Sequence, residues 1–123
     1  MEEKPLVLIA DDDADILALV RVRLERSGFA VISASDGTEA LALAASENPA
    51  IAIFDISMPG LSGIDVTRRL RETDVDTPVI LLTARALETD VEAGAAAGAN
   101  AYLTKPFSPQ DLEARVRSLI NGG

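Results

Sequence analysis

Short apolar runs alternate with amphipathic segments along the whole chain. The apolar runs are near-continuous, which is typical of strands buried on both faces of a sheet. Each intervening segment carries apolar residues at helical spacing. The strands are expected at residues 5–10, 29–34, 51–54, 78–83 and 100–104. The helices are expected at residues 14–27, from 36 to about 48, from 63 through 71, at 87–97, and from 109 onwards.

Local start and stop signals support these boundaries. Gly28 is a good helix stop after the first amphipathic segment. Ser108 is expected to cap the last helix, with Pro109 at its first position. The strict alternation of strands and helices predicts an α/β fold, because right-handed crossovers then build a parallel sheet with helices on both faces. We interpret the whole chain, residues 1–123, as one domain.

The segment from Ala93 to Ala99 contains only alanine and glycine. Gly94 weakens a helix, and small side chains have little bulk to pack, so a low-stability element is expected here. The alternative is a close helix–sheet contact that requires small residues, and both interpretations can hold.

The composition narrows the possible functions. The chain has no cysteine and no histidine, which excludes disulfides, imidazole catalysis and metal sites built from either residue. Its net charge of −9 argues against direct binding of nucleic acid through the phosphates. The sequence shows neither an apolar run long enough to cross a bilayer nor a cationic, apolar leader. A soluble cytoplasmic protein without a membrane contact is therefore expected.

Chemically active side chains stand at the ends of four expected strands. Asp11 and Asp12 follow the first strand, Asp55 follows the third, Thr83 ends the fourth and Lys105 follows the fifth. Because open α/β sheets bind ligands at the carboxyl ends of their strands, these side chains are expected to converge. Clustered carboxylates disfavour full ionisation, and a divalent cation relieves the repulsion. Hard oxygen ligands favour Mg²⁺ over zinc.

Together these groups suit phosphoryl transfer. An ammonium group helps to keep Asp55 ionised and nucleophilic, while Mg²⁺ and the lysine would neutralise charge on the phosphoryl oxygens. Thr83 offers a hydrogen bond to an arriving phosphoryl group. Each residue alone has an ordinary alternative, since an acid after a strand often caps a helix or forms a turn. We assign Asp13 to the start of the first helix.

The active residues occur in four motifs, Ala10-Asp11-Asp12-Asp13, Asp55-Ile-Ser-Met-Pro-Gly-Leu-Ser-Gly63, Leu82-Thr83-Ala84 and Tyr102-Leu-Thr-Lys105-Pro106-Phe107. In this order and spacing, over essentially the whole chain, the sequence resembles the receiver domain of bacterial two-component response regulators. The resemblance implies a CheY-like, flavodoxin-like doubly wound fold, with strand order 2-1-3-4-5 and five helices on both faces of the sheet.

The resemblance also implies a role for each site residue. Asp55 would be the phosphoacceptor. Mg²⁺ would be held by Asp12 directly, by Asp11 largely through water, by Asp55, and by the backbone carbonyl of Ser57. Thr83 would bond the phosphoryl group and reorient, and Lys105 would pair with that group. The peptide bond between Lys105 and the following proline is expected to be cis.

Three further positions have implied regulatory roles. Tyr102 stands where the family keeps an aromatic switch that rotates together with Thr83, although a strand aromatic that packs on its neighbours is the ordinary alternative. Ser57 and Arg85 occupy the two positions that control the lifetime of the phosphoryl group.

The expected partners follow from the same resemblance. A sensor histidine kinase or a phosphotransfer protein would donate the phosphoryl group, and the surface of the last two helices and the last strand would bind a downstream protein or an output domain. A phosphorylation-dependent homodimer is possible. Receivers of the OmpR type often carry Gly-Ala-Asp-Asp-Tyr, whereas this chain has Asn100 and Ala101 in place of the acids, while Arg115 and Arg117 remain. A stand-alone protein and a part of a larger regulator are both open.

Two other function classes share parts of this pattern. A phosphatase with an aspartyl nucleophile usually carries a second acid two residues after it, where this chain has Ser57. A phosphate-independent interaction module typically loses an acid, the threonine or the lysine, and this chain keeps them all. We therefore expect a phosphorylation switch that is no enzyme beyond catalysing its own phosphorylation and dephosphorylation.

Overall fold

A computed structural model describes residues 4–84 and 88–121, and along them five strands alternate with five helices. The strands are β1 (Leu6–Ala10), β2 (Ala30–Ala34), β3 (Ile51–Asp55), β4 (Val79–Thr83) and β5 (Ala101–Thr104). The helices are α1 (Ala14–Arg26), α2 (Gly37–Glu47), α3 (Gly63–Glu72), α4 (Glu88–Ala97) and α5 (Pro109–Ile120). All strand pairs are parallel, in the order β2-β1-β3-β4-β5, which confirms the predicted fold class.

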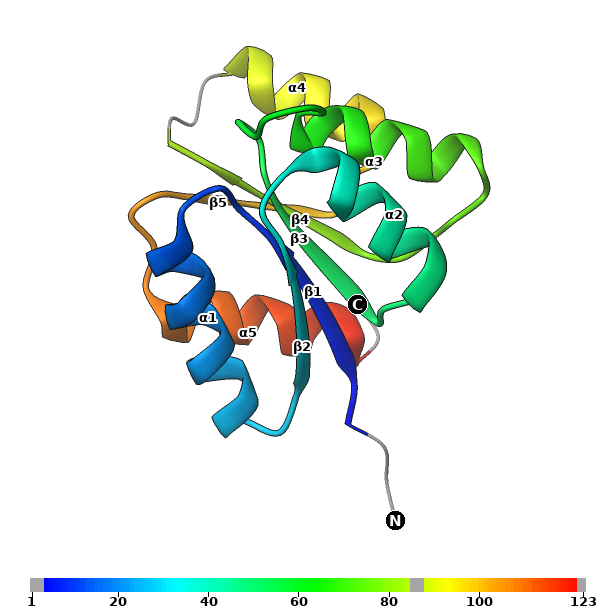
Figure 1. The fold of residues 1–123 in the computed structure, drawn as a ribbon. Helices are drawn as coiled ribbons and strands as arrows, with labels where there is room; N and C mark the ends of the chain where they lie inside the picture. Colours follow the sequence, from blue (N-terminus) through cyan, green and yellow to red (C-terminus); the bar gives the residue numbers. More distant parts are fainter. Residues whose placement is uncertain (1–3, 85–87, 122–123) are drawn as a thin grey trace.

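Two helical layers enclose the sheet (Figure 1). Helices α1 and α5 cover one face, and α2, α3 and α4 cover the other. Alternate residues of each strand therefore enter different cores. In β1, Val7 and Ile9 belong to the core beneath α1 and α5, whereas Leu8 and Ala10 belong to the core beneath the other three helices. This double burial explains why the strands are apolar throughout. Among the described helices, none is both long and apolar enough to span a membrane.

The predicted boundaries agree with the structure to within about one residue. β1, β2, β4 and β5 each begin one residue later than expected, and β3 continues through Asp55. Pro5 and Pro78 precede their strands because proline has no N–H to donate to a ladder. Their carbonyl groups still accept hydrogen bonds, from Ala30 and Ala52 respectively, at 2.9 Å. The first residue of the predicted fourth helix, residue 87, lies outside the described residues.

Side-chain caps begin several helices near the edge of the sheet where the strands end. Asp13 Oδ1 accepts a hydrogen bond from the Asp15 backbone N–H at 2.9 Å, which confirms its predicted place at the start of α1. Ser108 Oγ accepts from the backbone N–H groups of the two residues after Pro109, at 3.1 and 3.2 Å. Gly28, with a φ of +96°, ends α1 as expected.

The start of α3 lies directly against the end of β3. A Cβ atom on Gly63 would lie 3.0 Å from the carbonyl carbon of Asp55 and 3.1 Å from Phe54 Cβ, so only glycine allows this approach. The Gly63 N–H donates to the carbonyl of Ile56 at 3.0 Å and closes the intervening loop. The loop therefore folds back tightly and holds Asp55 at the tip of its strand.

Helix α4 is attached to the sheet through small side chains. Of its residues whose burial the structure describes, Gly94 and Ala97 are buried. A Cβ atom on Gly94 would lie 2.8 Å from Leu81 Cδ1 and from Tyr102 Cε1. The close helix–sheet contact proposed for the Ala93–Ala99 segment is confirmed. Its low stability stays a prediction, supported by the small apolar area that such residues bury.

Candidate functional site

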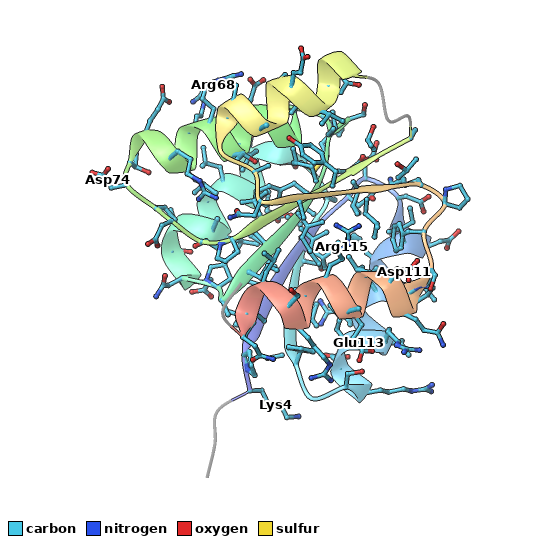
Figure 2. All side chains as sticks on the ribbon, turned by 180° about the vertical axis from the view of Figure 1, so that it is seen from behind. Lys4, Arg68, Asp74, Asp111, Glu113 and Arg115 are labelled. Carbon is cyan, nitrogen blue, oxygen red and sulfur yellow. The ribbon has the colours of Figure 1, made fainter. Side chains whose placement is uncertain are left out.

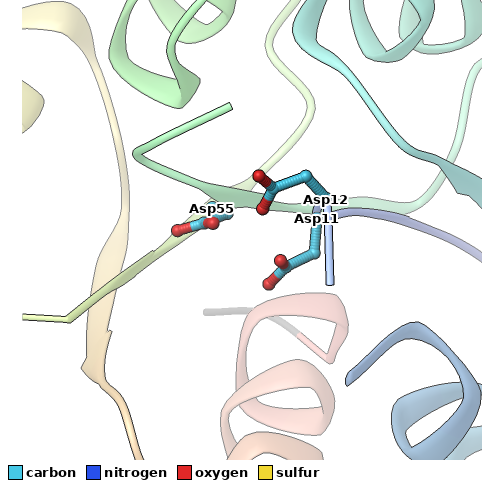
Figure 3. A group of neighbouring side chains, drawn as sticks. All are labelled: Asp11, Asp12 and Asp55. Carbon is cyan, nitrogen blue, oxygen red and sulfur yellow. The ribbon is translucent and has the colours of Figure 1, made fainter. Parts of the chain in front are cut away.

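Three carboxylates meet at the carboxyl ends of β1 and β3 (Figure 3). Ligand oxygens of Asp11, Asp12 and Asp55 all lie within 4.8 Å of one another. Asp11 is fully buried, Asp55 is 6% exposed, and Asp12 is exposed. The register of β1 and β3 brings these acids together, because Ala10 pairs with Phe54 and the next residue of each strand is therefore adjacent to the other. The predicted convergence of the acids is confirmed.

Lys105 reaches the buried acids from the end of β5. Its Nζ lies 2.8 Å from Asp11 Oδ2 and 3.3 Å from Asp55 Oδ2. Its backbone N–H donates to the carbonyl of Thr83 at 2.7 Å, so the ends of β4 and β5 are held together here. The peptide bond between Lys105 and Pro106 is cis, as predicted.

Burial and charge shift the protonation of these groups. Burial, and next the negative charge of Asp11, raise the pKa of Asp55, with partial opposition from Lys105. Burial alone would lower the pKa of Lys105. Its hydrogen bonds to Asp11 and Asp55 and their charges outweigh that effect, so the pKa of Lys105 lies above its usual value. At neutral pH Lys105 therefore stays positively charged. It lies beside three acidic residues, whose combined negative charge one cation cannot balance.

The donor set fits a hard divalent cation. Asp11, Asp12 and Asp55 each offer a carboxylate oxygen, and the charged form of Asp55 is disfavoured in its present surroundings. A cation between the three would relieve that cost, and oxygen ligands alone suit Mg²⁺. The cluster therefore has the oxygen ligands that the predicted Mg²⁺ site requires, and the binding of the ion stays a prediction.

A cavity of about 420 Å³ opens beside Asp55. Its lining residues are Asp55, Ile56, Ser57, Thr83, Ala84, Asp90 and Lys105. Thr83 is buried, at 5% exposure, at the end of β4. The cavity thus brings a carboxylate, a hydroxyl and an ammonium group around one space, and Ser57 joins them as expected from its place two residues after Asp55.

Asp90 is a lining residue that the sequence analysis missed. It lies in the first turns of α4 and enters the cavity wall from outside the sheet. Nothing in the sequence distinguishes it from Glu92, which lies two residues further on and is exposed. Only the placement of α4 over the end of β4 shows which acid faces the site.

Tyr102 connects β5 to α4. Its hydroxyl donates to the backbone carbonyl of Val91 at 2.8 Å, and its ring lies against Gly94. Burial raises the pKa of Tyr102, so the hydroxyl stays a neutral donor at physiological pH. This position suits a switch between the sheet and α4, and the rotation itself stays a prediction. Arg85, the second predicted lifetime residue, lies outside the described residues.

Asn100, one of the two positions that depart from the OmpR-type pattern, and Arg117, one of the remaining arginines, form hydrogen bonds within the chain. Asn100 Oδ1 accepts hydrogen bonds from the first backbone N–H of β4 at 2.9 Å and from Arg71 Nη2 at 3.2 Å. Arg117 donates to Glu113 at 3.1 Å and to the Ser27 carbonyl at 3.0 Å, so it links α5 to the end of α1. The predicted homodimer stays untested.

Comparison with known proteins places this chain in one family. The model of the response regulator receiver domain matches residues 7–117. The chain is 43% identical over 114 residues to the alkaline phosphatase synthesis transcriptional regulatory protein PhoP of Bacillus subtilis. The aligned residues make up 93% of this chain and 48% of that protein. The chain spans about half the length of the curated relatives it matches.

Solved structures agree in fold. The receiver domain of the Francisella response regulator 1452 superposes with a TM-score of 0.91 at 38% identity, covering 96% of this chain and 98% of that chain. The receiver domain of the sensor histidine kinase PA1611 from Pseudomonas aeruginosa superposes with a TM-score of 0.88 at 30% identity, covering 98% of this chain and 100% of that chain. That structure has a magnesium ion coordinated in the active site cleft.

Proposed function

This chain belongs to the response regulator receiver domain family, and we propose that it is a phosphorylation-activated switch in which Asp55 accepts a phosphoryl group. One observation carries the proposal. Asp55 stands in the wall of a cavity that also contains Thr83 and Lys105, with the acids Asp11 and Asp12 within ligand distance of each other and of Asp55. A nucleophile, a cation site, a hydroxyl and an ammonium group are the parts that phosphoryl transfer to a carboxylate requires.

The chemical step is a displacement at phosphorus. An oxygen of the Asp55 carboxylate attacks the phosphorus of a phosphohistidine, and an acyl phosphate bond forms while the P–N bond breaks. The imidazole leaves with the electron pair of that bond, as a neutral ring when its other nitrogen already carries a proton. Lys105 stabilises the added charge, and Thr83 donates a hydrogen bond to a phosphoryl oxygen.

Asp11, Asp12, Asp55 and the Ser57 backbone carbonyl are the groups that would hold Mg²⁺. Bound there, the ion would supply positive charge that stabilises the phosphoryl oxygens. The chain's own residues orient the reaction: the tight loop between β3 and α3 fixes Asp55, and the ion pair with Asp11 keeps Lys105 beside it.

The donor is proposed to be a sensor histidine kinase or a phosphotransfer protein that docks on α1. Leu19 and Val22 are exposed on that helix, at 50% and 47%. Leu19 also lines an apolar groove with Phe107 and with Lys105, the residue that lines the phosphoacceptor cavity. A donor whose phosphohistidine enters the cavity would therefore cover this groove and bury its apolar side chains.

Leu19→Asp is expected to slow phosphotransfer from a histidine kinase about tenfold or more, because a charge would be buried in the interface. Labelling by acetyl phosphate should stay unchanged, since a small donor needs no docking surface. The measurement uses any purified kinase that phosphorylates the wild-type chain, with Glu47→Lys, on α2 away from the groove, as the control. Equal loss with both donors would contradict the docking role.

The output is proposed to pass through α4, β5 and α5. Figure 2 shows this face, with Arg115 and Asp111 on α5. The curated relatives are transcriptional regulatory proteins about twice as long as this chain. We therefore propose that the face controls an output domain or a downstream protein, and that this domain itself does not contact nucleic acid, in keeping with its net charge of −9.

The proposal is tested by intact-protein mass spectrometry. After incubation with acetyl phosphate, the protein should gain the mass of one phosphoryl group when Mg²⁺ is present, and far less or none when the metal is chelated. Beryllofluoride should bind under the same metal condition. If neither an adduct nor beryllofluoride binding is detected with Mg²⁺, the phosphoacceptor role is wrong and a phosphate-independent interaction module is the better account.

A further inference from the structure

Helix α4 contributes an acidic residue, Asp90, to the wall of the phosphoacceptor cavity. Asp90 lines that cavity together with Asp55 and Thr83, although it belongs to a different layer of the fold. On the premise of the proposed function, we infer that Asp90 is a positioning residue: it repels the phosphoryl group on Asp55 and so drives the amino-terminal end of α4 away from the site.

The charge balance of the cavity gives the repulsion its direction. Phosphorylation replaces the single negative charge of Asp55 with a phosphoryl group that carries about −2. Among the described residues that line the cavity, Lys105 is the cation, and it forms ion pairs with Asp11 and Asp55 at 2.8 and 3.3 Å. Lys105 and a bound Mg²⁺ would be present before and after phosphorylation, so the net charge that faces Asp90 still becomes more negative by about one unit. Across a partly enclosed space, like charges interact more strongly than in bulk water.

Helix α4 is held to α3 at its carboxyl end. At the carboxyl end, Arg71 donates to the Gly98 carbonyl from Nη2 at 2.9 Å and from Nε at 3.2 Å. The same guanidinium contacts Asn100 at 3.2 Å, so the turn into β5 is tied to α3. Of the α4 residues whose burial the structure describes, the small Gly94 and Ala97 are the buried ones. A force on Asp90 would therefore be resisted at the carboxyl end by the contacts with Arg71, and would move the turns that carry Asp90.

The displacement has a direct route to Tyr102. Val91 follows Asp90 in the chain, and its carbonyl accepts the hydrogen bond from the Tyr102 hydroxyl at 2.8 Å. Gly94, one turn further on, lies against the same ring. Moving the first turns of α4 breaks this hydrogen bond and opens space beside the ring. Asp90 thus links the phosphoryl charge to the aromatic switch without acting through Thr83.

By thermodynamic linkage, the repulsion affects both the position of α4 and the affinity of the site for a phosphoryl mimic. A phosphoryl group shifts the equilibrium of α4 only if it interacts differently with the two positions of the helix, and Asp90 supplies such a difference. By reciprocity, the same repulsion weakens binding of a phosphoryl mimic while α4 occupies the position described here. Removing the charge should therefore tighten binding of the mimic and weaken the response of α4.

The test compares Asp90→Asn with Glu92→Gln, which removes one negative charge from the exposed face of the same helix. The full chain is titrated with beryllofluoride and Mg²⁺, and the amide NMR signals of Val91, Gly94 and Tyr102 are followed. With Asp90→Asn, affinity for beryllofluoride should rise about threefold or more. At saturation with beryllofluoride, these amide NMR signals should shift from their positions in the free protein less than half as far as they do in the wild type. Glu92→Gln should match the wild type in both respects, and Asp90→Glu, which keeps the charge, should restore most of the wild-type response.

The outcomes separate the two claims. Wild-type protein that binds beryllofluoride, together with an Asp90→Asn variant whose saturated spectrum equals that of the wild type, overturns the role of Asp90 and leaves the phosphoacceptor proposal standing. Weaker beryllofluoride binding by Asp90→Asn also overturns it, because the carboxylate would then assist binding. Wild-type protein that fails to bind beryllofluoride overturns both claims. Thermal unfolding of each variant verifies that it is folded.

Discussion

Replacing Asp55 with asparagine is expected to abolish the phosphoryl adduct completely, whatever the donor. The amide of asparagine has no carboxylate oxygen to attack phosphorus, while its size leaves the loop between β3 and α3 in place. The measurement is intact-protein mass after incubation with acetyl phosphate and Mg²⁺. Asp13→Asn is the matched control, because Asp13 is exposed and caps α1 outside the cavity. An adduct that persists at full yield in Asp55→Asn would move the phosphoacceptor to another residue.

The same substitution is expected to raise the free energy of unfolding at pH 7 in the absence of Mg²⁺. Burial and Asp11 raise the pKa of Asp55 above its ordinary value of 3.8, so the folded protein binds this proton more tightly than the unfolded chain does. The contribution of Asp55 to stability is therefore present at low pH and is lost as pH rises through its folded pKa. Asparagine avoids that loss.

Denaturant unfolding over a pH series measures this effect. The advantage of Asp55→Asn over the wild type should be absent at the acid end, appear as pH rises above 3.8, and stay constant towards neutrality. Adding Mg²⁺ should reduce the advantage, because the ion stabilises the wild-type cluster by binding its folded state. A variant that is less stable than the wild type at pH 7 without the metal would show that the ionised Asp55 is not a net cost.

Replacing Lys105 with methionine is expected to lower the free energy of unfolding by about 2 kcal/mol at pH 7 without Mg²⁺. The change removes the cation that lies 2.8 Å from the fully buried Asp11, and an unpaired buried carboxylate is costly. The loss falls short of the roughly 3–5 kcal/mol typical of deeply buried pairs, because the Lys105 side chain retains 20% exposure. Denaturant unfolding measures the effect.

Two further readouts identify its electrostatic origin. The pKa of Lys105 lies above its ordinary 10.5, so its contribution is complete below that pH and is lost as pH rises through the folded pKa. The difference in the free energy of unfolding between the wild type and Lys105→Met should therefore shrink only in strong alkali. Mg²⁺ should stabilise Lys105→Met more than the wild type, because the ion replaces the missing charge.

A surface ion pair supplies the control for this prediction. Arg68, labelled in Figure 2, lies on α3. It pairs with Asp65 at 2.7 Å, and both side chains are about half exposed. Arg68→Met should cost under about 0.5 kcal/mol, because solvent screens an exposed pair. Equal losses in Arg68→Met and Lys105→Met, or no response of Lys105→Met to Mg²⁺, would contradict the account of Lys105 as the counter-ion of a buried cluster.

Local patterns in the sequence determined the fold and most of the site. Near-continuous apolar runs marked the five strands, and local caps such as Ser108 marked helix starts, because burial on two faces and the geometry of a helix terminus act over a few residues. The strand-end positions of Asp11, Asp55 and Lys105 predicted their meeting, since parallel strands end at one edge of the sheet.

Only the tertiary structure decided how these groups pair and what else faces them. The Lys105 ammonium lies closer to Asp11 than to Asp55. This difference in distance depends on strand register and on depth of burial rather than on spacing along the chain. Asp90 enters the cavity and Gly94 accommodates the Tyr102 ring because of where α4 lies over the sheet. A weakly patterned helix of small residues carries little information about that placement, because its position is set by contacts between residues that are distant in the sequence.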